Sequence, residues 1–187
     1  MFNRIIRAAM LDVAFYNEVE ADTSLTQEAL IVVVLVSIAS GLGAFIGGII
    51  GAEFARAIIG LLVVIVLGVV NYYIWAYVTY FVGTNLFKGT ADPGELLRVL
   101  GYASGPRLLG ILSFIPCVGG IASLIGAIWA LIAGFIGVRE ALDLDTIKTL
   151  VTVIIGWVIV LVINLVIGRV LGVGAAGFGA AASFLQR

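Results

Sequence analysis

The sequence predicts an all-α fold, a polytopic membrane helical bundle with five transmembrane spans and short interfacial helices. Of the 187 residues, 63% are hydrophobic and 11% are charged, whereas soluble domains carry about a quarter charged residues. Several long apolar stretches reach or exceed the roughly 20 residues that one helical membrane crossing needs. Charged residues gather mainly in the segments between these stretches, as expected for a chain that crosses a bilayer repeatedly.

Residues 1–24 are predicted to form an interfacial amphipathic helix. Apolar residues at helical spacing share one face, and arginine, glutamate and asparagine lie away from it. The apolar set is Phe2, Ile5, Ile6, Ala9, Val13 and Tyr16. A helix packed on the protein's own polar loops fits the pattern equally well, because the polar face lacks the Lys/Arg-rich composition of strong membrane binders.

A transmembrane domain is predicted over residues 25–169. Ser24 is expected to cap the first span, with Gln27 completing a capping box, and the span should run from about residue 28 to 50. It carries glycines at four-residue steps, which favour close helix packing in a membrane. These are Gly43, Gly47 and Gly51.

The second span is predicted over residues 57–87. At about 1.5 Å per residue it exceeds a hydrocarbon core of about 30 Å, so it should tilt or protrude. Its later half is rich in tyrosine and tryptophan, which prefer the headgroup level. Asn71 lies deeper in a span without nearby charged residues. We therefore expect Asn71 to join helices rather than line a polar path.

The polar connection after residue 87 predicts a short helix. Asp92 can cap it, Pro93 suits its first position, and Glu95 completes a capping box. The helix should end near Ser104, before Gly105 and Pro106, and it is apolar enough to lie in the membrane interface.

An uncharged run from Leu108 to Val138 admits three topologies, which are one broken span, a hairpin of two spans, and a re-entrant element that enters the membrane and returns. A cluster of turn residues near its middle favours a hairpin over one broken span, although about 8 to 12 residues before the turn are few for a full crossing. The predicted helix break consists of Pro116, Gly119 and Gly120. The hairpin places Cys117 near the outer face.

Counting the charged residues on each side does not separate the hairpin from the single broken span. With either one, seven of the ten Lys and Arg residues share the side of the N-terminus, which is therefore predicted to be cytoplasmic by the excess of positive charge in cytoplasmic loops. In the five-span arrangement these seven are Arg4, Arg7, Lys88, Arg98, Arg107, Arg139 and Lys148.

The last span is predicted from Thr146 to Gly168, with Asp145 as its cap and Asn164 as a second intramembrane polar residue. A second packing face lies in the preceding span at Gly126, Ala130 and Gly134. We expect one of the two small-residue faces to pack internally and the other to meet a neighbouring protein. Residues 170–187 form a Gly/Ala-rich C-terminal tail.

The composition also excludes several kinds of catalytic and binding site. The chain has no histidine and one cysteine, and its net charge is -1, which excludes Ser-His-Asp and Cys-His catalysis, Cys/His zinc sites and a basic nucleic-acid surface. Gly172, Gly174 and Gly177 match a dinucleotide-binding spacing, but a membrane helix precedes them where a strand is needed. We expect no catalytic residue, cofactor or metal, and therefore no enzyme.

Two segments, "LLRVLGYASGPRLLGIL" and "IGAIWALIAGFIGVREALDLDTIKTL", resemble the Yip family of membrane proteins, known as Rab-GTPase-interacting factors. The resemblance covers about residues 29–168, and its most specific elements are Gly101, Tyr102 and the helix from Trp129 to Leu142. It implies five spans with a cytoplasmic N-terminus, which favours the hairpin. The Asp-Leu-Tyr-Gly-Pro signature and the long cytosolic N-terminal region of eukaryotic members are absent. The chain is thus similar to a prokaryotic member, and Rab binding is not carried over.

The leading functional hypothesis is a non-enzymatic scaffold or accessory subunit that acts through helix packing within a larger membrane complex. A small-solute or lipid transporter and a membrane-shaping protein are the alternatives. Expected partners are membrane lipids and a protein in the membrane, with no nucleic acid. The expected location is the cell (inner) membrane, with the N-terminus cytoplasmic and the C-terminus outside.

Overall fold

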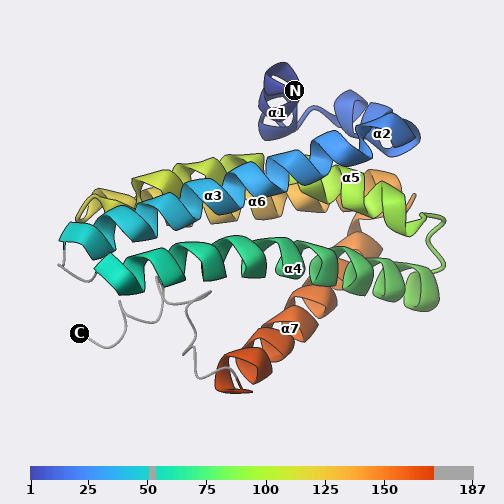
Figure 1. Cartoon of the computed structure of the whole chain (residues 1–187). Coiled ribbons are helices and arrows are strands. Elements are labelled where there is room, and N and C mark those ends of the chain that lie inside the picture. The colour runs from blue at the N-terminus through green and yellow to red at the C-terminus, as the bar shows by residue number, and fades with distance from the viewer. Residues whose placement is uncertain (51–53, 171–187) are drawn as a thin grey trace.

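A computed structural model describes residues 1–50 and 54–170, and all its regular elements are helical. Figure 1 shows α3, α4 and α6 with similarly directed axes, while α7 diverges from them toward its C-terminal end, and η2 packs against both α3 and α6. The long helices are α3 (Thr26–Ile50), α4 (Phe54–Phe87), α6 (Val118–Ala141) and α7 (Thr146–Val170). The shorter ones are α1 (Phe2–Ala9), α2 (Val13–Ala21), α5 (Pro93–Ala103) and the 3₁₀ helices η1 (Thr23–Leu25) and η2 (Gly105–Phe114).

The predicted all-α membrane bundle is confirmed. Within the described residues, α3, α4, α6 and α7 are the helices long and apolar enough to cross a membrane. Their outward sides carry exposed isoleucine, leucine and valine, a surface suited to lipid because burial in hydrocarbon costs apolar side chains nothing. Helices α3, α4 and α7 begin and end within three residues of the predicted spans.

The predicted count of five spans is wrong, because the first arm of the hairpin is η2 and not a membrane-spanning helix. A 3₁₀ helix rises about 2.0 Å per residue, so the ten residues of η2 extend about 20 Å, less than a hydrocarbon core of about 30 Å. Pro106 and Pro116 bracket this arm, and each proline removes a backbone donor. The predicted reversal at Pro116 does occur, and Cys117, with φ of 64°, leads into α6.

The predicted caps agree with the structure at two helices and differ at one. Asp92 and Glu95 form the expected capping box on α5 (2.8 and 2.9 Å), and the Asp145 carboxylate accepts from the Lys148 backbone N–H (2.9 Å). Ser24 does not cap the first span. The Asp22 carboxylate accepts instead from the backbone N–H and the hydroxyl of Ser24, because η1 begins at Thr23 and places Ser24 inside a helical turn that Asp22 caps.

Residues 1–24 form two helices instead of the predicted single one. The chain bends after Met10, where Leu11 has φ of 62°, and Asp12 caps α2 by accepting from the Phe15 backbone N–H (3.2 Å). The bend changes which residues share a face, so Tyr16 is fully buried while Val13 is exposed.

Helix α5, predicted to lie in the membrane interface, is enclosed by the protein. It packs against α1, α2, α3, α4 and α6, and Leu96, Val99 and Tyr102 are fully buried. The close approach of α3 depends on Gly101, since a Cβ there would lie 2.9 Å from the Ala29 carbonyl oxygen. The apolar side chains that suggested a membrane interface serve the protein core.

The first glycine face packs on η2 through Gly43. A Cβ at Gly43 would lie 2.2 Å from the Ser113 hydroxyl and 2.8 Å from the Gly110 carbonyl oxygen. Gly47 lies within α3, but its surroundings, like Gly51 itself, fall outside the described residues.

The second glycine face also packs internally, contrary to the expectation of a face left for a neighbouring protein. A Cβ at Gly126 would lie 2.7 Å from the Pro106 carbonyl oxygen, and one at Gly134 would lie 3.5 Å from Leu100. Gly134 is buried and Ala130 is half-buried. Helix α6 therefore uses this face against η2 and α5.

Replacing Gly43 by alanine should destabilise the bundle. The new methyl group would meet backbone as well as a side chain, and overpacking of this kind costs about 1 to 3 kcal/mol. A thermal melt of the purified protein in mild detergent measures the change. Gly60→Ala is the matched control, because a Cβ at Gly60 meets nothing within 4 Å. Equal melting temperatures for the two variants would contradict the close contact between α3 and η2.

Candidate functional site

The two intramembrane asparagines predicted from the sequence bind each other. The Asn164 side-chain amide of α7 donates to the Asn71 side-chain oxygen of α4 (2.9 Å) and to the Val160 carbonyl oxygen (2.8 Å). Further along the same helix pair, Thr79 of α4 is fully buried and faces Gly156 of α7, whose added Cβ would lie 3.4 Å from the Thr79 hydroxyl. The asparagines therefore join α4 to α7, the role expected for Asn71.

A double-mutant cycle on Asn71→Leu and Asn164→Leu should report coupling of about 1 kcal/mol, the usual range for a hydrogen bond between membrane helices. Each single variant leaves one amide without its partner, so the double variant should lose less stability than the two single losses combined. The measurement is thermal unfolding in detergent. Strict additivity would contradict the bond.

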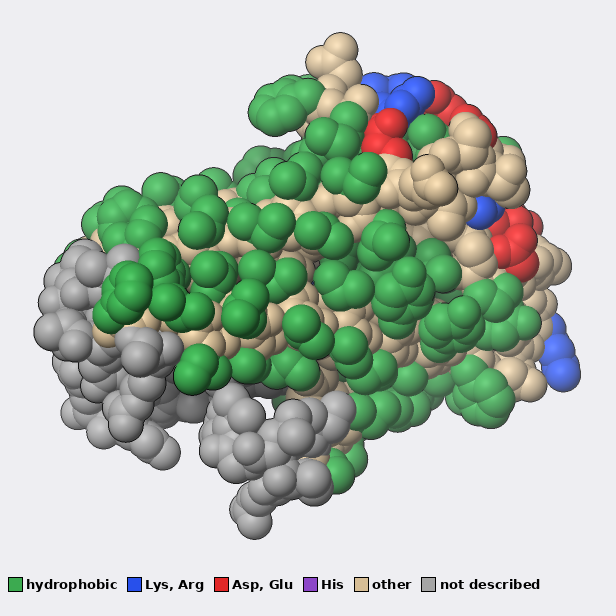
Figure 2. Space-filling model, in the orientation of Figure 1, with side chains coloured by type: hydrophobic (Ala, Val, Ile, Leu, Met, Phe, Trp, Pro, Cys, Tyr) green, Lys and Arg blue, Asp and Glu red, His purple; other side chains and the backbone are tan. Residues whose placement is uncertain are grey.

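Charged side chains gather toward one end of the molecule. Figure 2 shows them over the N-terminal helices and the adjoining end, while the rest of this face is mainly hydrophobic. Two connections meet there, since the Thr90 hydroxyl donates to the Asp143 carboxylate (2.8 Å) and the Thr90 backbone N–H donates to the Leu142 carbonyl oxygen (3.2 Å). We call this region the polar end, and we call α1 and α2 together the N-terminal cap.

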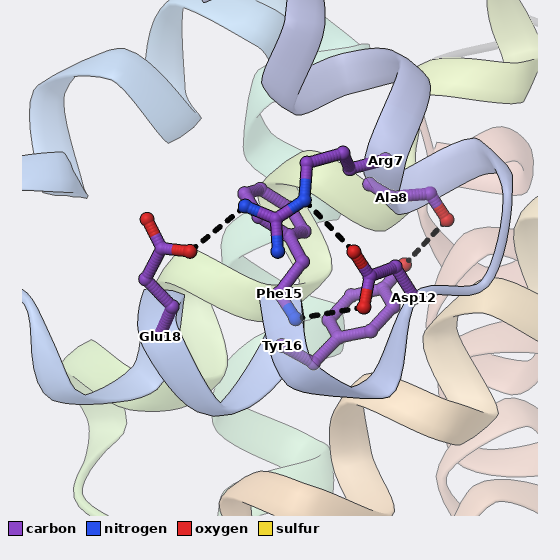
Figure 3. Close-up of polar contacts among 6 residues, drawn as sticks. All are labelled: Arg7, Ala8, Asp12, Phe15, Tyr16 and Glu18. Atoms are coloured by element: carbon purple, nitrogen blue, oxygen red, sulfur yellow. Dashed lines mark hydrogen bonds and ion pairs between the residues drawn. The ribbon is translucent and has the colours of Figure 1, made fainter.

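A charged network fixes the shape of the N-terminal cap (Figure 3). Arg7 of α1 binds the carboxylates of Asp12 (2.8 Å) and Glu18 (2.9 Å), and its guanidinium lies 4.9 Å from the centre of the Phe15 ring. Beneath it, the buried Tyr16 hydroxyl donates to the Ala8 carbonyl oxygen (3.1 Å). The pKa of Asp12 is lowered, chiefly by the hydrogen bond from Arg7. These contacts hold α1 and α2 at a defined angle.

Arg98 of α5 anchors the N-terminal cap to the bundle. Its side chain donates from Nε to the Val19 carbonyl oxygen (3.0 Å) and from Nη2 to the Glu20 carbonyl oxygen, although Arg98 is only 3% exposed. These carbonyls lie in the last turn of α2, where helix ends carry unpaired acceptors and a partial negative charge. The guanidinium satisfies both acceptors and is itself stabilised by them.

Glu20 lies beside this anchor in an unfavourable environment for a carboxylate. One of its oxygens is buried without a hydrogen-bond partner. The pKa of Glu20 is raised to about 7, chiefly by burial and also by the nearby acidic residues Asp143, Glu95 and Glu140, while Arg98 opposes the shift. The carboxyl group of Glu20 therefore titrates near neutral pH.

Local sequence patterns do not distinguish Arg98 or Glu20 as functional residues. Arg98 is predicted only to share the side of the N-terminus with six other cations. A signal was present, because Arg98 stands within the apolar run from Leu96 to Tyr102, where a charged side chain needs a partner if the helix is enclosed. That partner is a pair of backbone carbonyls 79 and 78 residues away, which the local pattern does not reveal.

Stability should fall as the pH rises from about 5 to about 8. The folded-state pKa of Glu20, about 7, exceeds its ordinary 4.5, so the folded protein binds more protons between these values. The stabilisation is complete below about pH 4.5 and is lost as the pH rises through 7. After solvent screening the effect is on the order of 1 kcal/mol.

Melting temperatures across this pH range test the titration. Glu20→Gln should flatten the profile. An unaltered slope in Glu20→Gln would assign the pH dependence to another group.

No cluster of three or more metal-ligating side chains occurs in the part of the chain that the structure describes. The dinucleotide-like glycines Gly172, Gly174 and Gly177 lie outside that part, as does the C-terminal tail beyond residue 170.

Comparison with known proteins adds one finding. A family model of the Yip1 domain matches residues 12–184, so the matched segment includes α2 of the N-terminal cap and all the membrane-spanning helices. No curated protein and no solved structure matches the chain.

Proposed function

Because the matched segment covers nearly the whole chain, the protein belongs to the Yip1 domain family, and from this premise we propose that it is a non-enzymatic membrane scaffold or accessory subunit. In this proposal it acts through contacts with another protein. The observation that carries the proposal is the ordered N-terminal cap, a polar structure held on the end of a membrane bundle by the buried Arg98.

The N-terminal cap offers a water-facing surface on α2. Its inner side, with Phe15, Tyr16 and Val19, is fully buried, while Ala14, Asn17, Glu18 and Ala21 are exposed. Because Arg7 and Arg98 hold this helix from both sides, a partner that docks on it meets a preorganised surface. Binding to such a surface loses little conformational entropy.

The family and the charge distribution together support a location. The polar end carries the N-terminal cap with Arg4 and Arg7, and the connections that follow α4 and α6 also lie there. Excess positive charge is typical of the cytoplasmic side. We therefore propose the cell (inner) membrane with the N-terminus cytoplasmic. The C-terminus is proposed to lie outside, because α7 begins at the polar end and leads away from it, while the short η2 carries the chain back between α5 and α6.

Membrane shaping is a second candidate, supported by α1. Phe2, Ile6 and Met10 are exposed on or just after a helix that also carries Arg4 and Arg7. An apolar helix face of this kind inserts into the boundary between headgroups and acyl chains, and shallow insertion on one leaflet favours curvature.

Purification of the full chain from its native membrane in mild detergent, followed by native mass measurement, tests the scaffold role. A stoichiometric partner should co-purify with the wild type. Asn17→Arg should release it without changing the melting temperature, because Asn17 is exposed. The matched control is Thr23→Arg, at an exposed position beyond α2, which should retain the partner.

Reconstitution into liposomes tests the alternatives with the same protein. Saturable solute flux by the purified chain, abolished by Asn71→Leu or Asn164→Leu, would refute the scaffold role in favour of transport. Liposome tubulation that requires Phe2 and Ile6 would favour membrane shaping.

A further inference from the structure

An apolar groove lies between the N-terminal cap and the bundle. Its volume is about 360 Å³, and it is lined by Ala9 at the end of α1, by Trp129 of α6 and by residues of η2. A 3₁₀ helix has three residues per turn, and the lining residues occupy two of the three resulting faces of η2. The η2 lining includes Leu108, Leu109, Ile111 and Leu112. The volume is in the range of small-molecule sites, but the lining offers almost no polar group to orient a polar ligand.

The groove opens onto the lipid-facing surface of α6. Ile125, Ile128 and Ile132 are exposed on this helix around Trp129, and the Trp129 ring N–H donates to the Ala9 carbonyl oxygen (2.6 Å). Tryptophan with one polar contact is typical of the level where headgroups meet hydrocarbon. The groove thus continues a surface that lipid already covers in a membrane.

One cation flanks the groove. Arg107 stands between two pairs of lining residues in η2 and is exposed, and its side chain makes no ion pair or hydrogen bond with the described part of the chain. A 3₁₀ helix turns about 120° per residue, so Arg107 projects from the third face of η2, beside the groove and not into it.

The position of Arg107 along the bundle differs from its predicted place among the cations of the polar end. A Cβ at Gly126 would lie 3.5 Å from the Arg107 Cα atom, and Gly126 precedes Arg139 in α6 by thirteen residues, about 20 Å along the helix. With no side-chain partner among the described residues, a guanidinium beside an apolar groove favours binding of an anion, because isolated charges are costly next to hydrocarbon.

We propose that the groove and Arg107 form a binding site for one anionic phospholipid. An acyl chain occupies the groove of η2, Ala9 and Trp129, and the phosphate pairs with Arg107 at its edge. Arginine is suited to this role because its planar guanidinium offers two parallel donors to phosphate oxygens. The site is independent of the proposed scaffold role, since neither Arg107 nor any lining residue of the groove belongs to the exposed surface of α2 that is proposed for docking.

Native mass measurement of the full chain in detergent tests the site, with phosphatidylglycerol and phosphatidylcholine titrated as defined probes. The wild type should bind one phosphatidylglycerol at least fivefold more tightly than phosphatidylcholine. Ile111→Trp fills the groove and should weaken both lipids at least fivefold. The matched control is Ile121→Trp, an exposed α6 position outside the lining, which should bind as the wild type does.

Arg107→Gln should remove the preference for phosphatidylglycerol and keep phosphatidylcholine binding. Lys88→Gln, at an exposed position on the connection after α4, is its control and should keep the preference. If Ile111→Trp does not fold, Ile111→Ser should weaken chain binding by making the groove polar.

Two results would overturn the proposal. One is a preference for phosphatidylglycerol that survives Arg107→Gln. The other is thermal protection of the wild type by inorganic phosphate alone that persists undiminished in Ile111→Trp, since that would assign the site to a free anion and leave the groove without a role.

Discussion

The contact between Arg98 and the end of α2 determines how the polar end is built. A buried guanidinium is costly unless it is fully hydrogen-bonded, and the last turn of a helix is costly to bury unless its carbonyls find donors. The two hydrogen bonds from Arg98 to the carbonyl oxygens of Val19 and Glu20 reduce both of these costs. Because Arg98 belongs to α5, which packs on α3, α4 and α6, this single contact ties the N-terminal cap to the spanning helices. The same arrangement places the Glu20 carboxyl group in a partly buried position near other acidic residues, which raises its pKa.

Within the bundle, packing follows small residues and a few polar pairs. Lipid provides no hydrophobic drive for helix association, so close backbone approach and interhelical hydrogen bonds provide the specificity. Gly43 and Gly126 admit η2 between α3 and α6, and Asn71 with Asn164 joins α4 to the diverging α7. The result explains why a ten-residue 3₁₀ helix is stable at the position where a full span was expected. Its backbone is shielded by two neighbouring helices, as irregular backbone within a membrane must be.

The same arrangement separates the exposed side of α2 from the apolar groove, and these two surfaces suit different kinds of partner. The exposed side of α2 is polar and held rigidly, which suits a protein partner, whereas η2, Ala9 and Trp129 enclose an apolar groove that suits a lipid chain. Helix α1 lies between them, with Arg7 engaged on the side of α2 and Ala9 on the side of the groove. A lipid in the groove would therefore contact the element that also supports the docking surface.

The sequence by itself determined the class, the limits of α3, α4 and α7, the caps at Asp92 and Asp145, and the turn at Pro116, because each depends on composition or on chemistry within a few residues. It also identified Asn71 and Asn164 as polar residues within spans, although it did not pair them. Only the tertiary structure decided that η2 is too short to span, that α5 is enclosed, and that the glycine face of α6 packs internally. The same holds for Arg98, whose acceptors lie 78 and 79 residues away, and for Arg107, whose position along the bundle follows from its neighbour Gly126. Apolar periodicity shows that a face is covered, but lipid and protein cover it equally well, so the covering partner emerges only when distant segments are brought together.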